Sequence, residues 1–525
     1  MMHKMIKLVF TLLVVVTAAS CHKESPSQAQ IRLGIEVDPQ TLDPRQVRSL
    51  ESATVIHMLY EGLMRLDEHG KPVPAVAESL SLSEDQKTYT FKLRNSSWSN
   101  GEPLTADDFA ETWKSMLNRD FPAPNAHLLY AIKGAKEAKE GKIPLEQVGI
   151  RVPDTHTLVV ELENPTPYFL NLLTSYFYSP VSPQLREKGI LGLSDSALVT
   201  NGPFKIGHWD RNSELEVIKN AHYWNVSQIR LDKILLIASD PTTALALYAR
   251  GELDWVGSPM STLPADALAT LKQQGKVQIA PGMGVYLFRL NTAKEPFNDA
   301  RVRRALSLAL NRFDLVEHVL QGNQIPTMGF IPGSLLSKSP NYQGEDLELA
   351  RRLMREVIAE KGPLPSVTLC YGAAERNHKI AQVAQQQWKV AFGIEVALQS
   401  CEGKLFYDRL KNGDYQIGLR SWFGDFRDPI AFLEVFKYRN NGTNNTGWEN
   451  NHYIELLDAS SIERDETKRE KLLVEAEGLL LAEQPIIPLF YSTYNYLKNP
   501  SVKGVLFSEL GYLDFRNGYI DQKNE

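Results

Sequence analysis

One acidic residue stands out in the sequence because aromatic residues surround it. In "RSWFGDFRDP", residues 420–429, Asp425 lies among Trp422, Phe423 and Phe426 in a stretch that is typical of a turn. No local structural role accounts for this acid, which makes Asp425 a candidate functional residue.

The neighbouring Asp428, in contrast, has an ordinary structural explanation. Asp428 and Pro429 precede "IAFLEVF", and an acid followed by proline is typical of the first positions of a helix. We therefore expect a helix with apolar residues at helical spacing to follow them. Asp425 either binds a ligand or pairs with Arg420 or Arg427 and only orders the loop.

The segments that must position this loop alternate between strand and helix patterns along the whole chain. "TYTFKLR", residues 88–94, alternates with period two, and a capped amphipathic helix is predicted to start near Thr105. "PFNDARVRRALSLALNR", residues 296–312, is typical of a helix with an Asn/Asp cap and one apolar face. No repeat of fixed period interrupts this pattern, so the sequence predicts an α/β or mixed architecture of two lobes.

Composition and charge exclude some classes of protein. The chain has 525 residues, of which 43% are hydrophobic and 23% charged, as in globular proteins rather than disordered ones. Its formal net charge of −6 becomes −8 without residues 1–20, which contain two lysines and no acids. With no basic stripe to neutralise phosphates, a nucleic-acid partner is not expected.

A signal peptide is predicted at the N-terminus. A histidine and two lysines precede the apolar run 8–19, which is short for a membrane span but typical of a signal-peptide core. The following "TAASC" resembles a lipobox, so we expect residues 1–20 to be removed and Cys21 to be lipidated. Ordinary cleavage at the same bond, without lipid, is the alternative. Residues 21–30 are polar and are predicted to form a tether.

Two further cysteines could form a disulfide in an exported protein. Cys370 ends the apolar run "SVTLC", Cys401 ends "IEVALQSC", and a helical pattern lies between them, so the unit is predicted to be β-α-β. Strand ends of the same sense lie within disulfide reach in such a unit. Two free thiols are the alternative.

Motifs of catalysis are lacking from the sequence. It contains no P-loop, no G-x-S-x-G and no H-E-x-x-H. The closest histidine pairs, His57 with His69 and His208 with His222, are 12 and 14 residues apart, so no helical pair of metal ligands is present. We therefore predict a protein that is not an enzyme and needs no cofactor or metal.

Seven stretches together resemble the extracytoplasmic solute-binding proteins of peptide ABC importers, the oligopeptide- and dipeptide-binding family. They occur in order over nearly all of the chain after the predicted signal peptide, which makes the resemblance specific. The stretches are "TLDP" (41–44), "LYEGL" (59–63), "KPVPAVAES" (71–79), "TYTFKLRNSSWSNGEPLTADDF" (88–109), "NGPFKI" (201–206), "PFNDARVRRALSLALNR" (296–312) and "NNTGWENNHY" (444–453).

The resemblance implies a two-lobed α/β clamp, of the large peptide-binding class of periplasmic binding proteins, that closes on an extended peptide. It also implies an extra subdomain inserted in the first lobe and a chain that crosses twice between the lobes. Carried over to this sequence, lobe I takes residues 31–65, 192–282 and 494–525, the inserted subdomain 66–191, and lobe II 283–493.

The resemblance also implies a role for Asp425. The family's W-x-x-D pattern, matched here by Trp422 and Asp425, places an aspartate where it receives the α-ammonium of the peptide. A carboxylate in a cleft that loses water on closure binds a cation more strongly than in water, and aromatic neighbours such as Phe423 help to exclude water. Trp422, Tyr491 and Asn291 are further candidate ligand contacts, with a role in the core as the alternative.

Recognition of the peptide backbone is expected to resemble the addition of a strand to a sheet edge. The segments beside Gly424, around "IEVDPQ" (35–40) and at "VYLFRLN" (285–291) are the predicted edges.

Three positions depart from the family pattern. Phe423 stands where some members have a disulfide-bonded cysteine, and Arg289 stands where such members have an acid. The arginine that meets the peptide's terminal carboxylate in some members aligns with Leu419, and Arg420 is one position away. Recognition of the peptide's end and the preferred peptide length therefore stay open.

The expected function is capture of oligopeptides and their delivery to an ABC permease by a monomer at the extracytoplasmic face of the membrane, anchored through Cys21. The same fold binds dipeptides, cell-wall (murein) peptides or other small ligands, and an adhesin or chaperone role is a further alternative. A ligand with a free amine is favoured by Asp425.

Overall fold

The protein is described by a computed structural model that covers residues 29–336, 338–341 and 343–521. The predicted signal peptide and Cys21 lie outside the described residues. Strand β1 begins at Gln30, so the predicted tether overlaps this strand by one residue. None of the helices in the described ranges is long and apolar enough to cross a membrane.

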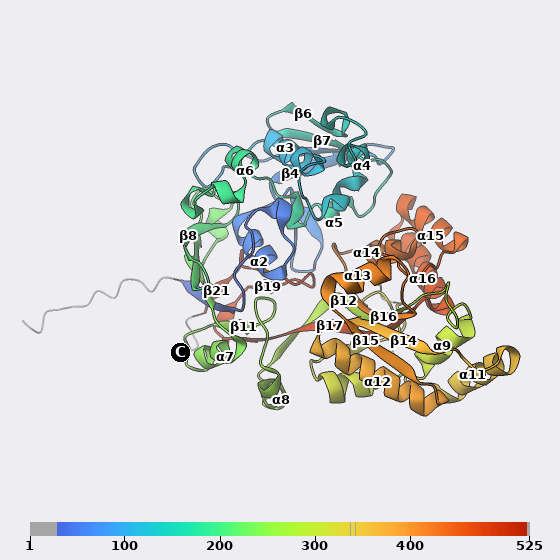
Figure 1. Cartoon of the computed structure of the whole chain (residues 1–525). Coiled ribbons are helices and arrows are strands. Elements are labelled where there is room, and N and C mark those ends of the chain that lie inside the picture. Colours follow the sequence, from blue (N-terminus) through green and yellow to red (C-terminus); the bar gives the residue numbers. More distant parts are fainter. Residues whose placement is uncertain (1–28, 337, 342, 522–525) are drawn as a thin grey trace, which may run out of the picture.

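One mixed sheet of eleven strands extends through both halves of the molecule (Figure 1). The strand order is β15-β14-β16-β12-β17-β11-β1-β10-β9-β8, and β13 also pairs with β17. The bounds are β1 Gln30–Ile35, β8 Phe204–Asp210, β9 Glu214–Lys219, β10 Lys233–Ala238, β11 Trp255–Gly257, β12 Gln278–Leu290, β13 Ile325–Pro326, β14 Val367–Gly372, β15 Val396–Cys401, β16 Ile417–Phe423 and β17 Ile486–Lys498.

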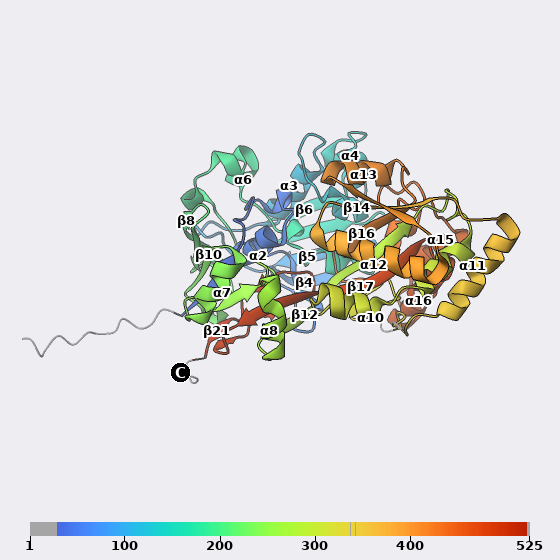
Figure 2. The ribbon, with the colours of Figure 1, turned by 60° about the horizontal axis from the view of Figure 1, so that its bottom comes forward.

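The long strands β12 and β17 connect the two halves, as Figure 2 shows. Their antiparallel register shifts between Pro281 and Val285, where a bulge interrupts the pairing. Gly284 lies in this bulge, where a Cβ atom would be 2.3 Å from the ring of Phe423, so a larger residue would displace that ring. The predicted crossings, after 282 and after 493, fall within these strands, and the lobe boundaries remain predictions.

A second, antiparallel sheet lies at the top of Figure 1, within the predicted inserted subdomain. Its order is β4-β5-β7-β6, with bounds β4 Ala77–Leu82, β5 Thr88–Leu93, β6 Ile150–Asp154 and β7 Thr157–Glu161. Tyr89, Phe91 and Leu93 alternate along β5 and are all buried, as the period-two pattern predicts. This sheet shares a continuous hydrophobic core with side chains of the predicted lobe II such as Phe432.

Helix boundaries follow the local signals in the sequence. Thr105 forms a capping box with Asp108 at the start of α3, and the Asp299 carboxylate accepts a hydrogen bond from the backbone N–H of Arg301 at the start of α9. After Asp428 the helix is shorter than expected: α14 is followed by a 3₁₀ turn at Glu434–Phe436. The bounds are α2 Leu50–Leu59, α3 Ala106–Leu117, α4 Ala135–Lys139, α5 Phe169–Leu172, α6 Pro183–Lys188, α7 Pro241–Ala249, α8 Ala265–Gln273, α9 Ala300–Leu308, α10 Arg312–Asp314, α11 Leu347–Lys361, α12 Glu375–Phe392, α13 Gly403–Lys411, α14 Ile430–Leu433, α15 Asn451–Ile462 and α16 Glu466–Glu483.

The β-α-β unit predicted around the cysteines is present as β14, α12 and β15, with the two strands parallel and adjacent. Cys370 and Cys401 are buried as free thiols, and their Sγ atoms lie 3.3 Å apart. This separation is a hydrogen-bond contact rather than a bond of about 2.05 Å. Only a small movement separates the thiols from a disulfide, which stays a prediction.

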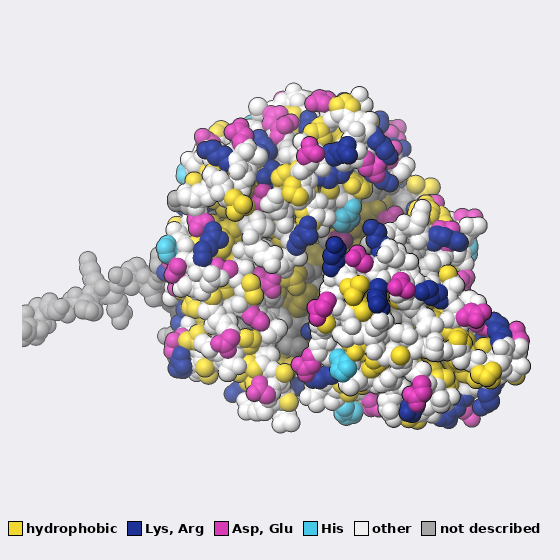
Figure 3. Space-filling model, viewed as in Figure 1, with side chains coloured by type: hydrophobic (Ala, Val, Ile, Leu, Met, Phe, Trp, Pro, Cys, Tyr) yellow, Lys and Arg dark blue, Asp and Glu magenta, His cyan; other side chains and the backbone are white. Residues whose placement is uncertain are grey.

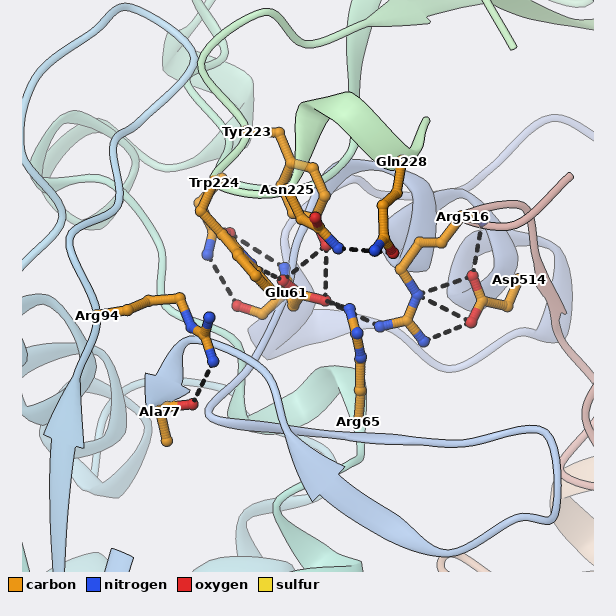
Figure 4. Close-up of polar contacts among 11 residues, drawn as sticks. Glu61, Arg65, Ala77, Arg94, Tyr223, Trp224, Asn225, Gln228, Asp514 and Arg516 are labelled. Atoms are coloured by element: carbon orange, nitrogen blue, oxygen red, sulfur yellow. Dashed lines mark hydrogen bonds and ion pairs between the residues drawn. The ribbon is translucent and has the colours of Figure 1, made fainter. Parts of the chain in front are cut away.

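A buried carboxylate joins segments that are far apart in the sequence and that all fall within the predicted lobe I (Figure 4). Glu61 accepts hydrogen bonds from Tyr223 Oη, Trp224 Nε1 and Arg516 Nη1, at 2.6–3.0 Å, and pairs with Arg65 at 3.3 Å. A buried charge is tolerated only when it is paired and hydrogen-bonded, and Glu61 meets both conditions. The network fixes the chain at Glu61, close to the predicted end of the first lobe I segment at residue 65.

Candidate functional site

The molecule is hollowed between its two halves (Figure 3), and a cavity of about 1200 Å³ lies beside the loop that follows β16. One wall comes from residues 127–172 of the predicted inserted subdomain, and the other comes from residues 422–462. Asp425 and Trp422 both line this cavity, as do Lys437 and Asp458. Two of the residues predicted from the sequence are therefore brought together on one wall.

Asp425 faces the opposite wall of the cavity. Its Oδ2 lies 3.6 Å from Nε2 of His127, in the 3₁₀ turn Ala126–Ala131, and both side chains are about half exposed. Tyr176 is also near: burial, with a smaller contribution from the charge of Asp425, raises the pKa of its phenol to about 12. The acid is thus accessible in the open cavity and has only a weak contact to replace when a ligand binds.

The alternative role of Asp425, an ion pair with a neighbouring arginine, is not what the structure shows. Arg427 turns away and pairs with Glu509, with Nε 3.4 Å from the carboxylate. Arg420 donates from Nη1 to Oδ1 of Asn445 at 3.0 Å. Within the described ranges neither arginine contacts Asp425, because each has a partner on its other side.

Trp422, Phe423 and Gly424 form the end of β16 and the start of the loop. Trp422 is half-buried, donates from Nε1 to the backbone carbonyl of Ala431 at 2.9 Å, and presents its ring to the cavity. Phe423 is 43% exposed, and its ring meets Tyr286 edge to face. At Gly424 a Cβ atom would lie 2.6 Å from the Met283 side chain, so glycine lets the loop pack closely.

Tyr491 and Asn291 lie apart from this group. Tyr491 is 9% exposed and donates from its hydroxyl to the backbone carbonyl of Ile331 at 2.6 Å. Asn291 is 5% exposed, and its Nδ2 donates to the carbonyls of Gly413 and Tyr415. Their polar groups serve internal contacts, which favours the core role for both, and their contact with a ligand stays a prediction.

The predicted sheet edges have different outcomes. The expectation for "VYLFRLN" is wrong, because β12 pairs with β16 over residues 284–290 and with β17 over 285–289, so both sides are used. In contrast, β14 pairs with β16 only at residues 417–419. Among the described strands, the 420–423 end of β16 is paired on one side only and has a free edge. Residues 36–40 follow the end of β1, and Val37 there is 56% exposed.

Three residues near Asp425 and Phe426 were not predicted from the sequence. His127 and Tyr176 approach Asp425, and the ring of Tyr168 stacks on Phe426 at 5.2 Å. They lie far from Asp425 in the sequence, in apolar segments without a motif, so no local signal marked them. No cluster of three or more metal-ligating side chains occurs in the part of the chain that the structure describes.

Two lobes joined by two long strands, with an accessible acid in the cavity between them, define a binding protein of the clamp type. The chain belongs to the bacterial extracellular solute-binding proteins of family 5. The model of this family, described as "Bacterial extracellular solute-binding proteins, family 5 Middle", matches residues 71–444.

Individual relatives are similar over almost the whole chain. The oligopeptide-binding protein OppA of Bacillus subtilis is 37% identical, covering 95% of this chain and 94% of its own. The dipeptide-binding protein DppE of the same organism is 34% identical, covering 92% and 90%. The unliganded open form of the periplasmic murein tripeptide binding protein MppA has a TM-score of 0.81 at 29% identity, covering 94% of this chain and 98% of that one.

Proposed function

We propose that this protein captures oligopeptides in the cleft between its lobes and delivers them to an ABC permease at the extracytoplasmic face of the membrane. The observation that carries the proposal is the position of Asp425, an accessible carboxylate in the cavity without an arginine partner among the described residues. A peptide's α-ammonium would replace the weak contact with His127 and be enclosed when the lobes close. Membership of the family and the OppA relative support this reading.

The peptide backbone would pair with the free edge of β16 at residues 420–423. This edge leads directly into the loop that carries Asp425, so a peptide anchored by its amine would be placed to continue along the strand. Main-chain pairing accepts many side chains, as a transporter of mixed peptides requires. Trp422 and Phe423 would flank the first residues of the ligand, and Arg420 could bind an acidic group of the ligand.

Anchoring through a lipidated Cys21, a monomeric state and the absence of catalysis complete the proposal. They rest on the sequence patterns described above and on the family's character as solute-binding proteins.

Mass spectrometry of ligands retained by the purified protein tests the proposed function. Peptides of several residues with mixed sequences and free amino termini are the expected result. If only dipeptides or murein peptides are recovered, the protein is still a binding protein, but its ligand class is dipeptides or murein peptides and not oligopeptides. A retained ligand without an amine, such as a sterol or a metal chelate, would overturn the role proposed for Asp425.

A further inference from the structure

Arg289, which is buried, and Arg420, which is partly buried, form a close pair of positive charges. In the antiparallel register of β12 and β16, Arg289 lies opposite Gly418 and Leu287 lies opposite Arg420. Opposite residues, and alternate residues along a strand, point to the same face, so both arginines lie on one face of the sheet. Nη1 of each donates to the same atom, Oδ1 of Asn445, at 3.0 Å.

Arg289 is completely buried, yet only one of its three guanidinium nitrogens has partners. Nη1 donates to the backbone carbonyls of Thr443 and Asn444 and to the Asn445 side chain. Nε and Nη2 are buried without a hydrogen-bond partner among the described residues. A buried donor left unpaired destabilises the folded state, and more so when it carries charge.

The other buried arginines of the described residues, Arg45, Arg303 and Arg312, are satisfied. All three guanidinium nitrogens of Arg303 and of Arg312 donate to neighbouring groups, mostly backbone carbonyls. Arg45 and Arg469 each pair with a buried carboxylate. Among the described residues, Nε of the half-buried Arg94 is the other buried guanidinium nitrogen without a partner, so Arg289 is unusual in leaving two donors unused.

The pKa values of the two arginines are consistent with positive charges that lack a negative partner. Burial, followed by the charge of Arg420, lowers the pKa of Arg289 to about 9, and burial also lowers the pKa of Arg420. A pKa of about 9 keeps Arg289 a cation near neutral pH. In the described ranges no carboxylate lies within ion-pair distance of either one. The Arg420 guanidinium lies 5.2 Å from the ring of Tyr407, and the Arg289 guanidinium lies 5.4 Å from the ring of Phe436.

We propose that Arg289 and Arg420 bind one small monovalent anion, of the chloride or bromide class, beneath the loop 443–446. The anion would accept from Nε and Nη2 of Arg289 and offset the repulsion between the two guanidinium groups. Thr443 also lines the cavity beside Asp425, so the anion would steady one wall of the proposed cleft. The inference depends on the arginine geometry and holds whatever ligand the cleft takes.

Bromide tests the site directly. In crystals grown in sodium bromide we expect an anomalous peak within hydrogen-bond distance of Arg289 Nε or Nη2. In solution, sodium bromide should raise the thermal unfolding midpoint of the wild type more than sodium gluconate does at equal ionic strength. The reason is that an anion bound only by the folded state stabilises it: above the dissociation constant of the site, each tenfold rise in bromide concentration raises the ratio of folded to unfolded protein about tenfold. Arg420→Gln should lose most of this response.

Arg427→Gln is the matched control, since Arg427 lies in the neighbouring loop with Glu509 as its partner and should keep the bromide response. The proposal would be overturned if the crystals showed a water molecule in place of the anion and the thermal unfolding midpoint were the same in bromide and in gluconate. An equal response in Arg420→Gln and wild type would overturn it as well.

A ligand carboxylate is another source of the same chemistry, and a pair of peptides separates the two sources. The bromide response is measured with the protein saturated by one peptide bearing either a free or an amidated carboxyl terminus. Loss of the response only with the free terminus assigns the site to the ligand's carboxylate. A response unchanged by both peptides assigns it to an anion from solution.

Discussion

Asp425→Asn is expected to weaken peptide binding while leaving the fold intact. Asparagine keeps the shape and one acceptor but removes the charge. The only ion pair of Asp425 among the described residues is the 3.6 Å contact with His127, and both groups are about half exposed. Since such contacts contribute little to stability, the unfolding midpoint should stay close to that of the wild type.

The size of the effect follows from the exposure of the site. Loss of one partner from a fully desolvated, hydrogen-bonded ion pair costs about 2–5 kcal/mol. Asp425 begins 45% exposed and becomes enclosed only when the lobes close, so water screens part of the interaction. We therefore expect the lower part of this range, about 2–3 kcal/mol, or a roughly 30- to 150-fold loss in affinity.

Calorimetric titration with one peptide and its N-acetylated form separates the anchor from other effects. Acetylation removes the ammonium and should weaken binding to the wild type by a similar factor. It should add little in Asp425→Asn, because both changes remove the same interaction. Asp458→Asn is the matched control: Asp458 lines the same cavity, but its carboxylate pairs with Lys437 at 2.7 Å, so the full acetylation penalty should remain.

Additive losses would refute the reasoning. If acetylation weakens Asp425→Asn as much as it weakens the wild type, the ammonium is bound elsewhere. A clearly lower unfolding midpoint for Asp425→Asn would show instead that the acid supports the loop.

Three further predictions concern the anchor, the thiols and pH. Cys21→Ser should move the protein from the membrane fraction to the soluble exported fraction, and unchanged partition would remove the lipid anchor. After export into an oxidising compartment, Cys370 and Cys401 should resist alkylation until reduced, with a bridge worth about 3–4 kcal/mol for a loop of about 30 residues; full alkylation without reductant contradicts this. Burial lowers the pKa of His57 to about 3, whereas an unfolded histidine titrates near 6.5, so the unfolded state binds more protons between these values and stability falls as pH falls through this window. Between pH 7 and 5 the loss should be about 2 kcal/mol in denaturant titrations, and His57→Gln should lack this part of the pH dependence.

Much of the local structure could be predicted because its causes lie within a few residues. The Thr105 capping box, the Asp299 cap and the β-α-β unit around the cysteines depend on hydrogen bonds and periodicity over one or two turns. The length of the helix after Asp428 was overestimated, because the same apolar pattern is compatible with a 3₁₀ turn once packing against Phe330 is added.

The identity of Asp425 as the candidate anchor also came from the sequence, through the tryptophan three residues before it. Its surroundings did not. Whether it would pair with Arg420 or Arg427 was open, and the structure decided it by giving both arginines partners from distant segments, Asn445 and Glu509.

The partners across the cleft were decided by tertiary structure alone. His127 reaches Asp425 because the sheet β4-β5-β7-β6 and the segment after β16 share one hydrophobic core. The stretch 285–289 of β12 has no free edge because β16 and β17 flank it there. The closeness of Arg289 to Arg420 likewise depends on strand register. A local sequence pattern indicates that a side chain requires a partner of opposite charge, a hydrogen-bond donor or burial. The group that becomes the partner depends on all the groups that packing brings within a few ångströms, and these groups come from distant parts of the sequence.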